Sequence, residues 1–261
     1  MNKSMKIWLI IGASFVVVGS LIVVAVMTVN KWDFTILSTV KYETNTYEIT
    51  DEFSSITIED STTDIIFVPS DNENCKVICR EETKLKHSVS VKNGVLTIGV
   101  TNTRKWYDNV GISIGGTKIT VYLPESEYEN LVIKTSTGDV EISDYYFDTI
   151  DISMSTGDVN LTDIECNSLV LTGSTGDVLL NNVIADTSIK IKRSTGDVKF
   201  VKCDAEEITV KVSTGDVNGS LLSDKNFIVD TSTGDIDVPN TTEGGVCEIT
   251  TSTGDINIEI E

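Results

Sequence analysis

Hydrophobic and polar positions follow a repeating pattern in the second half of this chain. Each repeat has two apolar residues spaced by two, then the tetrapeptide Ser-Thr-Gly-Asp, then two more apolar residues spaced by two. In the first copy, Leu131 and Ile133 precede the tetrapeptide, and Val140 and Ile142 follow it. Alternation with a period of two predicts strands with one buried face. The buried phase changes at the tetrapeptide, because Ile133 and Val140 are separated by an odd number of positions. The tetrapeptide is therefore predicted to be a corner between two strands.

This tetrapeptide occurs seven times, at spacings of 19, 19, 20, 19, 19 and 20 residues, which marks a repeat architecture. Its copies begin at Ser136, Ser155, Ser174, Ser194, Ser213, Ser232 and Ser252. A further apolar residue stands nine positions after the serine at Ile164, Val183, Cys203 and Leu222. The predicted fold class is all-β: a single-stranded β-solenoid (β-helix) of 19–20 residues per rung, preceded by one transmembrane α-helix.

One such rung could not fold alone. Burying four aliphatic side chains contributes roughly 8 kcal/mol. Ordering one rung costs about 1–2 kcal/mol for each of its residues. The rungs must therefore stack, with each strand pairing in parallel with its equivalent in the next rung.

The corner residues allow two hypotheses about chemistry. Glycine is expected to adopt a positive φ, while aspartate closes the corner as an Asx-type turn. The seven aspartates would then form a column at the strand spacing of about 4.8 Å; they are Asp139, Asp158, Asp177, Asp197, Asp216, Asp235 and Asp255. A Ca²⁺ ion could instead be bound by neighbouring Asp and Thr oxygens, although the G-G-x-G-x-D pattern of calcium-binding solenoids is absent. We favour the structural role, and expect no cofactor, no metal site and no catalytic residues.

The start of the chain predicts a membrane anchor. Residues 7–29 are 23 consecutive uncharged, mostly apolar positions, enough to span a bilayer as a helix. Lys3 and Lys6 precede them, so the positive-inside rule places the N-terminus in the cytoplasm. A cleaved signal peptide is the alternative, but the apolar run is too long and no A-x-A site ends it. We expect a single-pass cell-membrane protein with its C-terminal domain extracytoplasmic. Its parts are a cytoplasmic tail (1–6), a transmembrane helix (7–29), a connector (30–46) and a β-solenoid ectodomain (47–261).

Within this ectodomain, residues 47–130 are predicted to form irregular initial rungs, and 131–261 the seven regular repeats. Around Ser61, apolar residues occupy the offsets of the later copies, but Thr63 replaces the glycine, so this corner should use a different turn. Further strands are expected at 75–79, at 89–98 around an Asn-Gly turn, and at 119–123. Residues 101–116 are interpreted as an inserted loop, the one place where a unique catalytic site could be assembled.

These features together resemble a known family. An N-terminal anchor, the segment Phe53-Ser-Ser-Ile-Thr-Ile58, the strand Val121-Tyr-Leu-Pro124 and serial Ser-Thr-Gly-Asp-Val/Ile repeats are similar to the bacterial "putative adhesin" family, a domain of unknown function built of β-strand repeats. The resemblance covers about 47–261. It implies a cell-surface β-solenoid, sometimes encoded with envelope-stress systems, and no catalytic residues.

Charge limits the partners. After removal of Lys3 and Lys6, the chain has 18 basic and 40 acidic residues, a formal charge of −22. Such a surface should repel nucleic acid and anionic lipid and attract cations and cationic peptides. The simpler interpretation is that charge of one sign keeps a β-protein soluble. Five cysteines, an odd number without a common repeat phase, are expected to be mainly free thiols: Cys75, Cys79, Cys166, Cys203 and Cys247.

Three functions remain open. The first is a non-catalytic binding, adhesion or cell-envelope scaffold module that contacts an envelope polymer, a surface protein or a cationic peptide. The second is an accessory component of an envelope-stress response that acts through a membrane partner. The third, a polysaccharide-active β-helix enzyme, is disfavoured because the repeated carboxylates are equivalent in every rung and His87, the single histidine, lies in a polar stretch. We expect no enzyme activity, no nucleic acid and no small-molecule substrate.

The last strand, around Glu259 and Glu261, is expected to end the solenoid with unpaired backbone groups. Charge would then protect this end, or it would pair with another chain.

Overall fold

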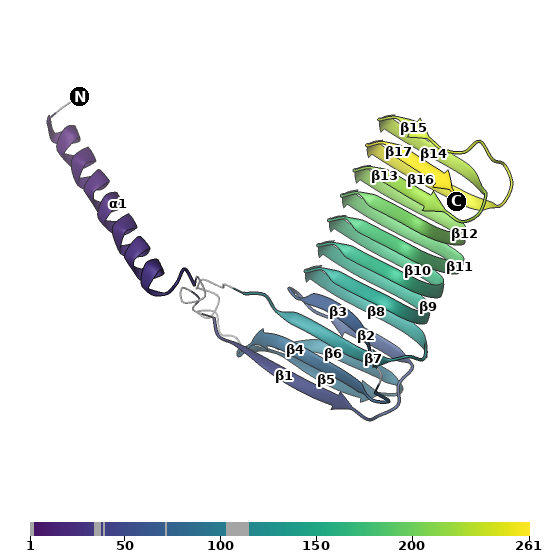
Figure 1. Cartoon of the computed structure of the whole chain (residues 1–261), viewed down its shortest axis with the longest axis horizontal. Coiled ribbons are helices and arrows are strands. Elements are labelled where there is room, and N and C mark those ends of the chain that lie inside the picture. The colour runs from purple at the N-terminus through teal and green to yellow at the C-terminus, as the bar shows by residue number, and fades with distance from the viewer. Residues whose placement is uncertain (1–2, 34–37, 39, 71, 103–114) are drawn as a thin grey trace. The chain divides into compact units, whose positions relative to one another are not determined.

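The structure is a computed structural model that describes residues 3–33, 38, 40–70, 72–102 and 115–261 (Figure 1). The chain divides into two compact units. The first contains helix α1 (Lys3–Val29), which is long and apolar enough to cross a membrane.

The second unit comprises Tyr42–Thr103 and Gly116–Glu261, and its regular structure is all β. Its strands are β1 (Tyr42–Ile49), β2 (Ser55–Glu59), β3 (Asp64–Ser70), β4 (Cys75–Glu82), β5 (Leu85–Lys92), β6 (Val95–Asn102), β7 (Lys118–Pro124), β8 (Glu127–Thr137), β9 (Val140–Thr156), β10 (Val159–Thr175), β11 (Val178–Thr195), β12 (Val198–Thr214), β13 (Val217–Leu221), β14 (Lys225–Thr233), β15 (Ile236–Asp237), β16 (Gly245–Thr253) and β17 (Ile256–Ile260). Strand β1 begins inside the segment expected to be a connector, so that segment ends earlier than predicted.

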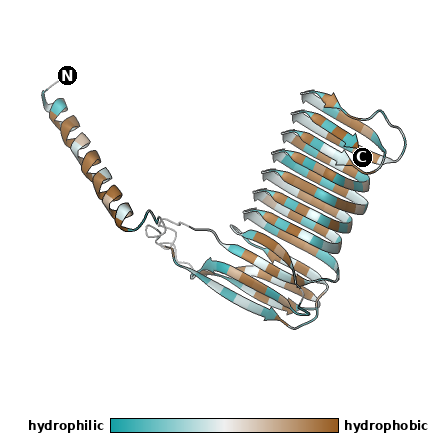
Figure 2. Cartoon of the chain, in the orientation of Figure 1, coloured by the Kyte–Doolittle hydropathy of each residue, from teal (hydrophilic) through white to brown (hydrophobic). Residues whose placement is uncertain are grey.

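Strands β8 to β12 confirm the predicted stacking of the repeats. They pair in parallel and in register, so that equivalent residues such as Ile150 and Leu169 lie side by side in adjacent rungs. The apolar positions on both sides of each corner are buried there; Ile152 and Val159, for example, are both 0% exposed. Figure 2 shows the resulting alternation of hydrophobic and hydrophilic positions along each strand. The nine-residue offset was wrong in one copy, because Leu221 is buried and Leu222 is exposed.

Each of these rungs has a second turn, which follows the tetrapeptide corner along the chain. Eight residues after the serine, the backbone takes a positive φ at Asp144, Asp163, Asn182 and Lys202. The extra residue of one 20-residue repeat is accommodated beyond this turn, where the β10–β11 register shifts between Cys166 and Ser168. A single insertion therefore leaves the buried positions of later rungs in phase.

The rung around Ser61 is also confirmed. Strand β2 pairs with β8 and β3 with β9, which places Ile58 beside Ile133 and Ile65 beside Val140. Thr63 stands in the glycine position but is absent from the positions with positive φ, so this corner differs as expected.

The remaining initial strands do not form rungs. Strands β4, β5 and β6 form an antiparallel meander, and β4 also pairs antiparallel with β1 and β7. Successive pairings of β2, β6, β5, β4, β7, β3, β9 and β8 close a ring of eight strands. The expectation of a purely single-stranded solenoid was therefore wrong here. The fold is all-β and solenoid-like, with a closed first layer whose antiparallel pairs have no signature in the 19-residue pattern.

The last rungs stack out of sequence order. Strand β16 lies between β12 and β14, and β17 lies between β13 and β15. The terminal rung is therefore formed by β14 and β15, not by the last strand, and the expectation of an open edge at Glu259 was wrong. Apolar residues are less buried in this terminal rung: Ile236 is 45% exposed, whereas its equivalent Ile256 is 0% exposed.

Candidate functional site

The corner aspartates form a continuous hydrogen-bonded ladder. In each pair of adjacent rungs, the backbone N–H of one corner aspartate donates to Oδ1 of the next; Asp177 N–H to Asp158 Oδ1 is 2.7 Å. The ladder begins at Asp64 and continues through Asp139, Asp158, Asp177, Asp197, Asp216, Asp255 and Asp235. Apart from that of Asp235 at the end of the ladder, each carboxylate therefore accepts a hydrogen bond from the neighbouring rung, and not from its own turn as the Asx hypothesis had it. This arrangement favours a structural role for the column over a calcium site.

A buried arginine lies behind these corners. Arg193 is 2% exposed and points over Gly173, where a Cβ atom would stand 2.2 Å from the guanidinium. Burial lowers the pKa of Arg193, while the nearby carboxylates of Asp158 and Asp177 act in the opposite direction. Its Nε has no hydrogen-bond partner. The guanidinium thus supplies positive charge to the column from inside the stack.

A second polar cluster is unique in the chain and is buried in the closed first layer. His87, the single histidine, is held between two carboxylates: its Nε2 lies 2.5 Å from Asp60 Oδ2 and its Nδ1 lies 2.6 Å from Glu81 Oε2. The three side chains are at most 3% exposed. Strands β2, β4 and β5 bring them together, because Asp60 follows β2, Glu81 lies on β4 and His87 on β5.

Every oxygen of this cluster has a donor. The backbone N–H groups of Ser61 and Thr62 donate to Asp60 Oδ1. The His87 backbone N–H donates to Glu81 Oε2 at 2.5 Å, and Asn45 Nδ2 donates to Glu81 Oε1 at 2.5 Å. The network is therefore fixed in geometry by backbone as well as side chains.

Burial acts to lower the pKa of His87, but the hydrogen bonds that its ring donates to Asp60 and Glu81, together with the charge of these carboxylates, outweigh burial, so this pKa is raised. Burial likewise acts to raise the pKa of Asp60, but the hydrogen bond and charge of His87 and the backbone N–H groups of Thr62 and Ser61 together outweigh burial, so that pKa is lowered. Both shifts favour an imidazolium between carboxylates, an arrangement that is stable when buried only because each charge is paired.

A thiol completes the cluster. Cys79 Sγ, a Glu81 carboxylate oxygen and a His87 ring nitrogen all lie within 4.8 Å of one another, the one such group of three potential metal ligands in the described part of the chain. Sequence analysis missed this cluster, because the three residues have no metal-site spacing and their meeting depends on antiparallel pairings. The alternation of Cys79 and Glu81 on one strand face was the available signal.

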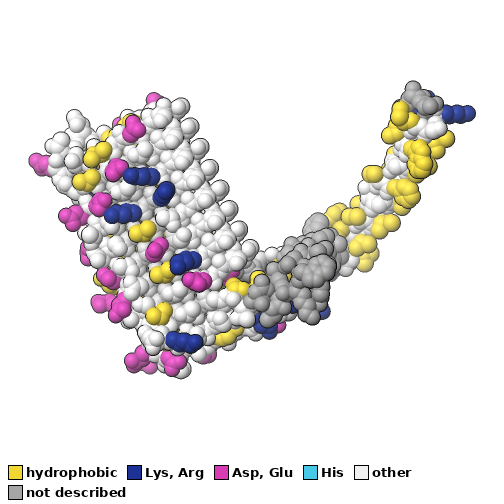
Figure 3. Space-filling view, turned by 180° about the vertical axis from the view of Figure 1, so that it is seen from behind, with side chains coloured by type: hydrophobic (Ala, Val, Ile, Leu, Met, Phe, Trp, Pro, Cys, Tyr) yellow, Lys and Arg dark blue, Asp and Glu magenta, His cyan; other side chains and the backbone are white. Residues whose placement is uncertain are grey.

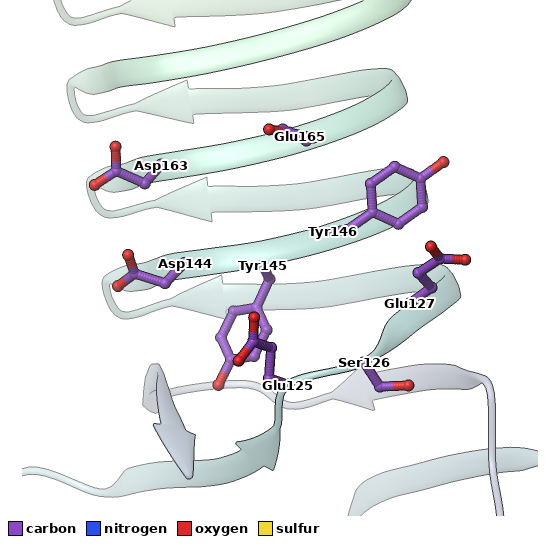
Figure 4. Close-up of a pocket in the computed structure, with 8 residues that line it drawn as sticks. All are labelled: Glu125, Ser126, Glu127, Asp144, Tyr145, Tyr146, Asp163 and Glu165. Carbon is purple, nitrogen blue, oxygen red and sulfur yellow. The ribbon is translucent and has the colours of Figure 1, made fainter. Parts of the chain in front are cut away.

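An acidic hollow lies on the outer side of the first regular rungs (Figure 4). Its lining residues include no basic side chain; they are Glu125, Ser126, Glu127, Asp144, Tyr145, Tyr146, Asp163 and Glu165. In Figure 4, Asp144 and Asp163 point to one side while Glu127 lies beside Tyr146 on the other. The carboxylates are spread along the hollow and do not converge on a point.

Two further expectations concern the five cysteines and the loop predicted at residues 101–116. All five cysteines are free and buried. Burial raises the pKa of Cys75, Cys79, Cys166 and Cys247 to about 12. Most of the predicted loop at 101–116 falls within 103–114, outside the described residues.

These features define a class: an all-β repeat domain of solenoid-like stacking, following an N-terminal apolar helix. The chain matches the Toastrack DUF4097 family over residues 53–261 and belongs to that family, whose function is unknown. This confirms the resemblance inferred from the repeats. The comparison with curated proteins found no match.

Several solved structures are similar in fold. A putative adhesin from Bacteroides fragilis NCTC 9343 is 18% identical, with 84% of this chain and 97% of that chain covered and a TM-score of 0.43. A putative adhesin from Parabacteroides merdae ATCC 43184 is 11% identical, with coverages of 84% and 96% and a TM-score of 0.37. A putative cell adhesion protein from Clostridium sporogenes ATCC 15579 is 12% identical, with coverages of 85% and 100% and a TM-score of 0.33.

Proposed function

We propose that this chain is a membrane-anchored, extracytoplasmic module of the cell envelope that binds a cationic partner segment and performs no catalysis. Helix α1 supplies the anchor in this proposal, with the N-terminus in the cytoplasm and the β unit outside. The observation that carries the proposal is the unequal compensation of charge on two sides of the repeat stack.

On one side, lysines and carboxylates neutralise each other. Lys134, Lys190 and Lys211 form ion pairs across rungs with Glu59, Glu207 and Glu248 at 3.6, 3.4 and 3.2 Å. Figure 3 shows a face on which basic and acidic side chains are interspersed. Exposed pairs of this kind contribute little to stability, but they reduce the net field of this side, here called the lysine side.

The acidic hollow and the rung positions that follow it have an excess of carboxylates. We call the set Asp148, Glu165, Asp186, Asp204 and Glu206 the acidic side. Asp204 forms an ion pair at 2.5 Å with Lys225, whose side chain is buried. At one position along the rungs, carboxylates alternate with other residues: Glu165 pairs with Tyr146 and Ile184, and Ile184 pairs with Asp204. A surface with such an excess of carboxylates attracts an extended segment with several positive charges, such as a lysine-rich peptide or an amine-bearing polymer.

The test uses the full chain in lipid nanodiscs. Cosedimentation with isolated envelope fractions and with polylysine is compared among wild type, an acidic-side variant (Glu165→Lys, Asp186→Lys, Glu206→Lys) and a matched lysine-side variant (Lys134→Glu, Lys190→Glu, Lys211→Glu). The proposal expects binding that weakens with salt and is lost only in the acidic-side variant. Equal binding by the two variants, or loss only in the lysine-side variant, would contradict it.

A further inference from the structure

The cluster of Asp60, Cys79, Glu81 and His87 is independent of the partner-binding surface proposed above. It is buried, it occurs once, and it combines a thiol, an imidazole and two carboxylates. We propose that this cluster is a transition-metal site, and that its ion is Zn²⁺ bound by Cys79 Sγ, Glu81 Oε2 and His87 Nδ1.

The ligand chemistry fits zinc. Zn²⁺ takes sulfur, imidazole nitrogen and carboxylate oxygen in tetrahedral sites, and three protein ligands leave a fourth position. Bonds of about 2.0–2.3 Å separate ligand atoms in such a site by roughly 3.4 Å. The three atoms here already lie within 4.8 Å of one another, so side-chain rotations of modest size would bring them to these separations.

The surrounding groups orient the ligands. His87 Nε2 lies 2.5 Å from Asp60 Oδ2 and His87 Nδ1 lies 2.6 Å from Glu81 Oε2. Asp60 therefore keeps a proton on Nε2, and loss of the Nδ1 proton would free a lone pair on the side of Glu81 and Cys79. A carboxylate that accepts from the second ring nitrogen is the usual partner of a metal-bound histidine. Asn45 and the His87 backbone N–H hold the Glu81 carboxylate in place.

The exchange of ion for protons also balances. Without metal, the site holds an imidazolium, a neutral thiol and two carboxylates, a net charge of −1. Binding of Zn²⁺ displaces the proton on His87 Nδ1 and the proton on Cys79 Sγ, and both leave for solvent. A divalent ion thus replaces two protons without changing the net charge of the buried cluster. Asp60 also lines an open surface hollow together with Ser88, which puts the cluster next to solvent.

The experiment uses the full chain in detergent, purified without a polyhistidine tag and stripped with a chelator. Zn²⁺ is titrated against a competing chelator, and Co²⁺ is added as a spectroscopic probe of thiolate ligation. We expect one Zn²⁺ per chain, a thiolate-to-cobalt charge-transfer band, and release of close to two protons per ion at neutral pH. Cys79→Ser should abolish the band, Cys79→Ser and His87→Gln should each weaken zinc binding more than 100-fold, and Asp60→Asn should weaken it about 10–100-fold.

Cys75→Ser is the matched control, because Cys75 is buried on the same strand but outside the cluster. It should bind zinc as wild type does. Zinc binding that is unchanged in Cys79→Ser would place the ion elsewhere and overturn the proposal. If Cys79→Ser fails to fold, the cobalt spectrum of wild type decides alone, since a folded protein without a thiolate band would equally overturn it.

Discussion

Gly176 is the position where the corner geometry can be tested most sharply. Its φ is +124°, and a Cβ atom added there would lie 2.1 Å from the carbonyl oxygen of Gly157 in the adjacent rung. Because the clashing atom belongs to the backbone, the clash can be relieved only by moving the two rungs apart. Three hydrogen bonds join them at this corner: Gly157 N–H to Thr175 O, Asp177 N–H to Asp158 Oδ1, and Val159 N–H to Asp177 O, at 2.9, 2.7 and 2.9 Å.

These contacts give the expected loss of unfolding free energy in Gly176→Ala. The positive φ costs about 1 kcal/mol in an alanine, and loss of three hydrogen bonds costs about 1 kcal/mol each. We therefore expect the free energy of unfolding to fall by roughly 4 kcal/mol. Gly94→Ala is the matched control, because Gly94 has a φ of +75° and nothing within 4 Å of the added Cβ; it should cost only the φ term, about 1 kcal/mol. Urea unfolding of the full chain, followed by circular dichroism, measures both. Equal losses in the two variants would refute the inter-rung contact as the reason for glycine.

Further predictions follow from the core, the buried cluster and the last rungs. Ile152→Asp buries a charge among aliphatic residues and should lower the urea midpoint more than Ser153→Asp, its exposed neighbour; similar midpoints would contradict the inward assignment. In chelator, the raised pKa of His87 contributes stability that is complete below the unfolded value of 6.5 and is lost as pH rises through the folded pKa. The lowered pKa of Asp60 contributes stability that is complete above pH 3.8 and is lost as pH falls through its folded pKa. The urea midpoint should therefore be highest between pH 3.8 and 6.5, and it should vary less with pH in His87→Gln. Parallel plots of midpoint against pH for wild type and His87→Gln would disprove the coupling. Gly245→Ala would place a Cβ atom 2.1 Å from Glu206 O and should displace β16, seen as faster proteolysis after residue 245 than in Gly116→Ala, where nothing lies within 4 Å; equal proteolysis would argue against the inserted rung. Because β14 and β15 form the terminal rung, Asp230→Val with Asp237→Val should increase self-association in light scattering, whereas Glu259→Val with Glu261→Val should not; the opposite result would restore the last strand as the open end.

The sequence alone predicts the regular part of this fold well, and for a physical reason. Alternating apolar positions around each Ser-Thr-Gly-Asp specify strand, corner and buried face locally, and adjacent rungs repeat the same pattern. Even the rung at Ser61, with threonine in place of glycine, follows from these offsets. The positive φ at glycine could likewise be anticipated, since values such as the +124° of Gly176 are adopted readily by glycine alone.

Rung order could not be predicted in this way. All repeats present similar edges, so the pattern does not say whether Val229 pairs with Val210 or, as observed, with Ile249. The choice depends on particular contacts: Lys225 on β14 pairs with Asp204 on β12, and Gly245 on the intervening strand β16 lies so close to β12 that an added Cβ atom would stand 2.1 Å from Glu206 O. The buried cluster escaped for a related reason. The polar sequence around His87 predicts an exposed side chain. Only the antiparallel pairing of β5 with β6 and of β4 with its neighbours buries His87 beside Asp60.

The proposed function requires that the β unit lie outside the cell and be anchored by α1. All five native cysteines are buried, so a single exposed cysteine can report location without background. Ser174 is exposed at a corner, and Ser174→Cys places a thiol there. The account predicts that a membrane-impermeant maleimide labels Ser174→Cys in intact cells, that wild type stays unlabelled, and that the labelled chain sediments with membranes. Labelling only after cell lysis would contradict the account.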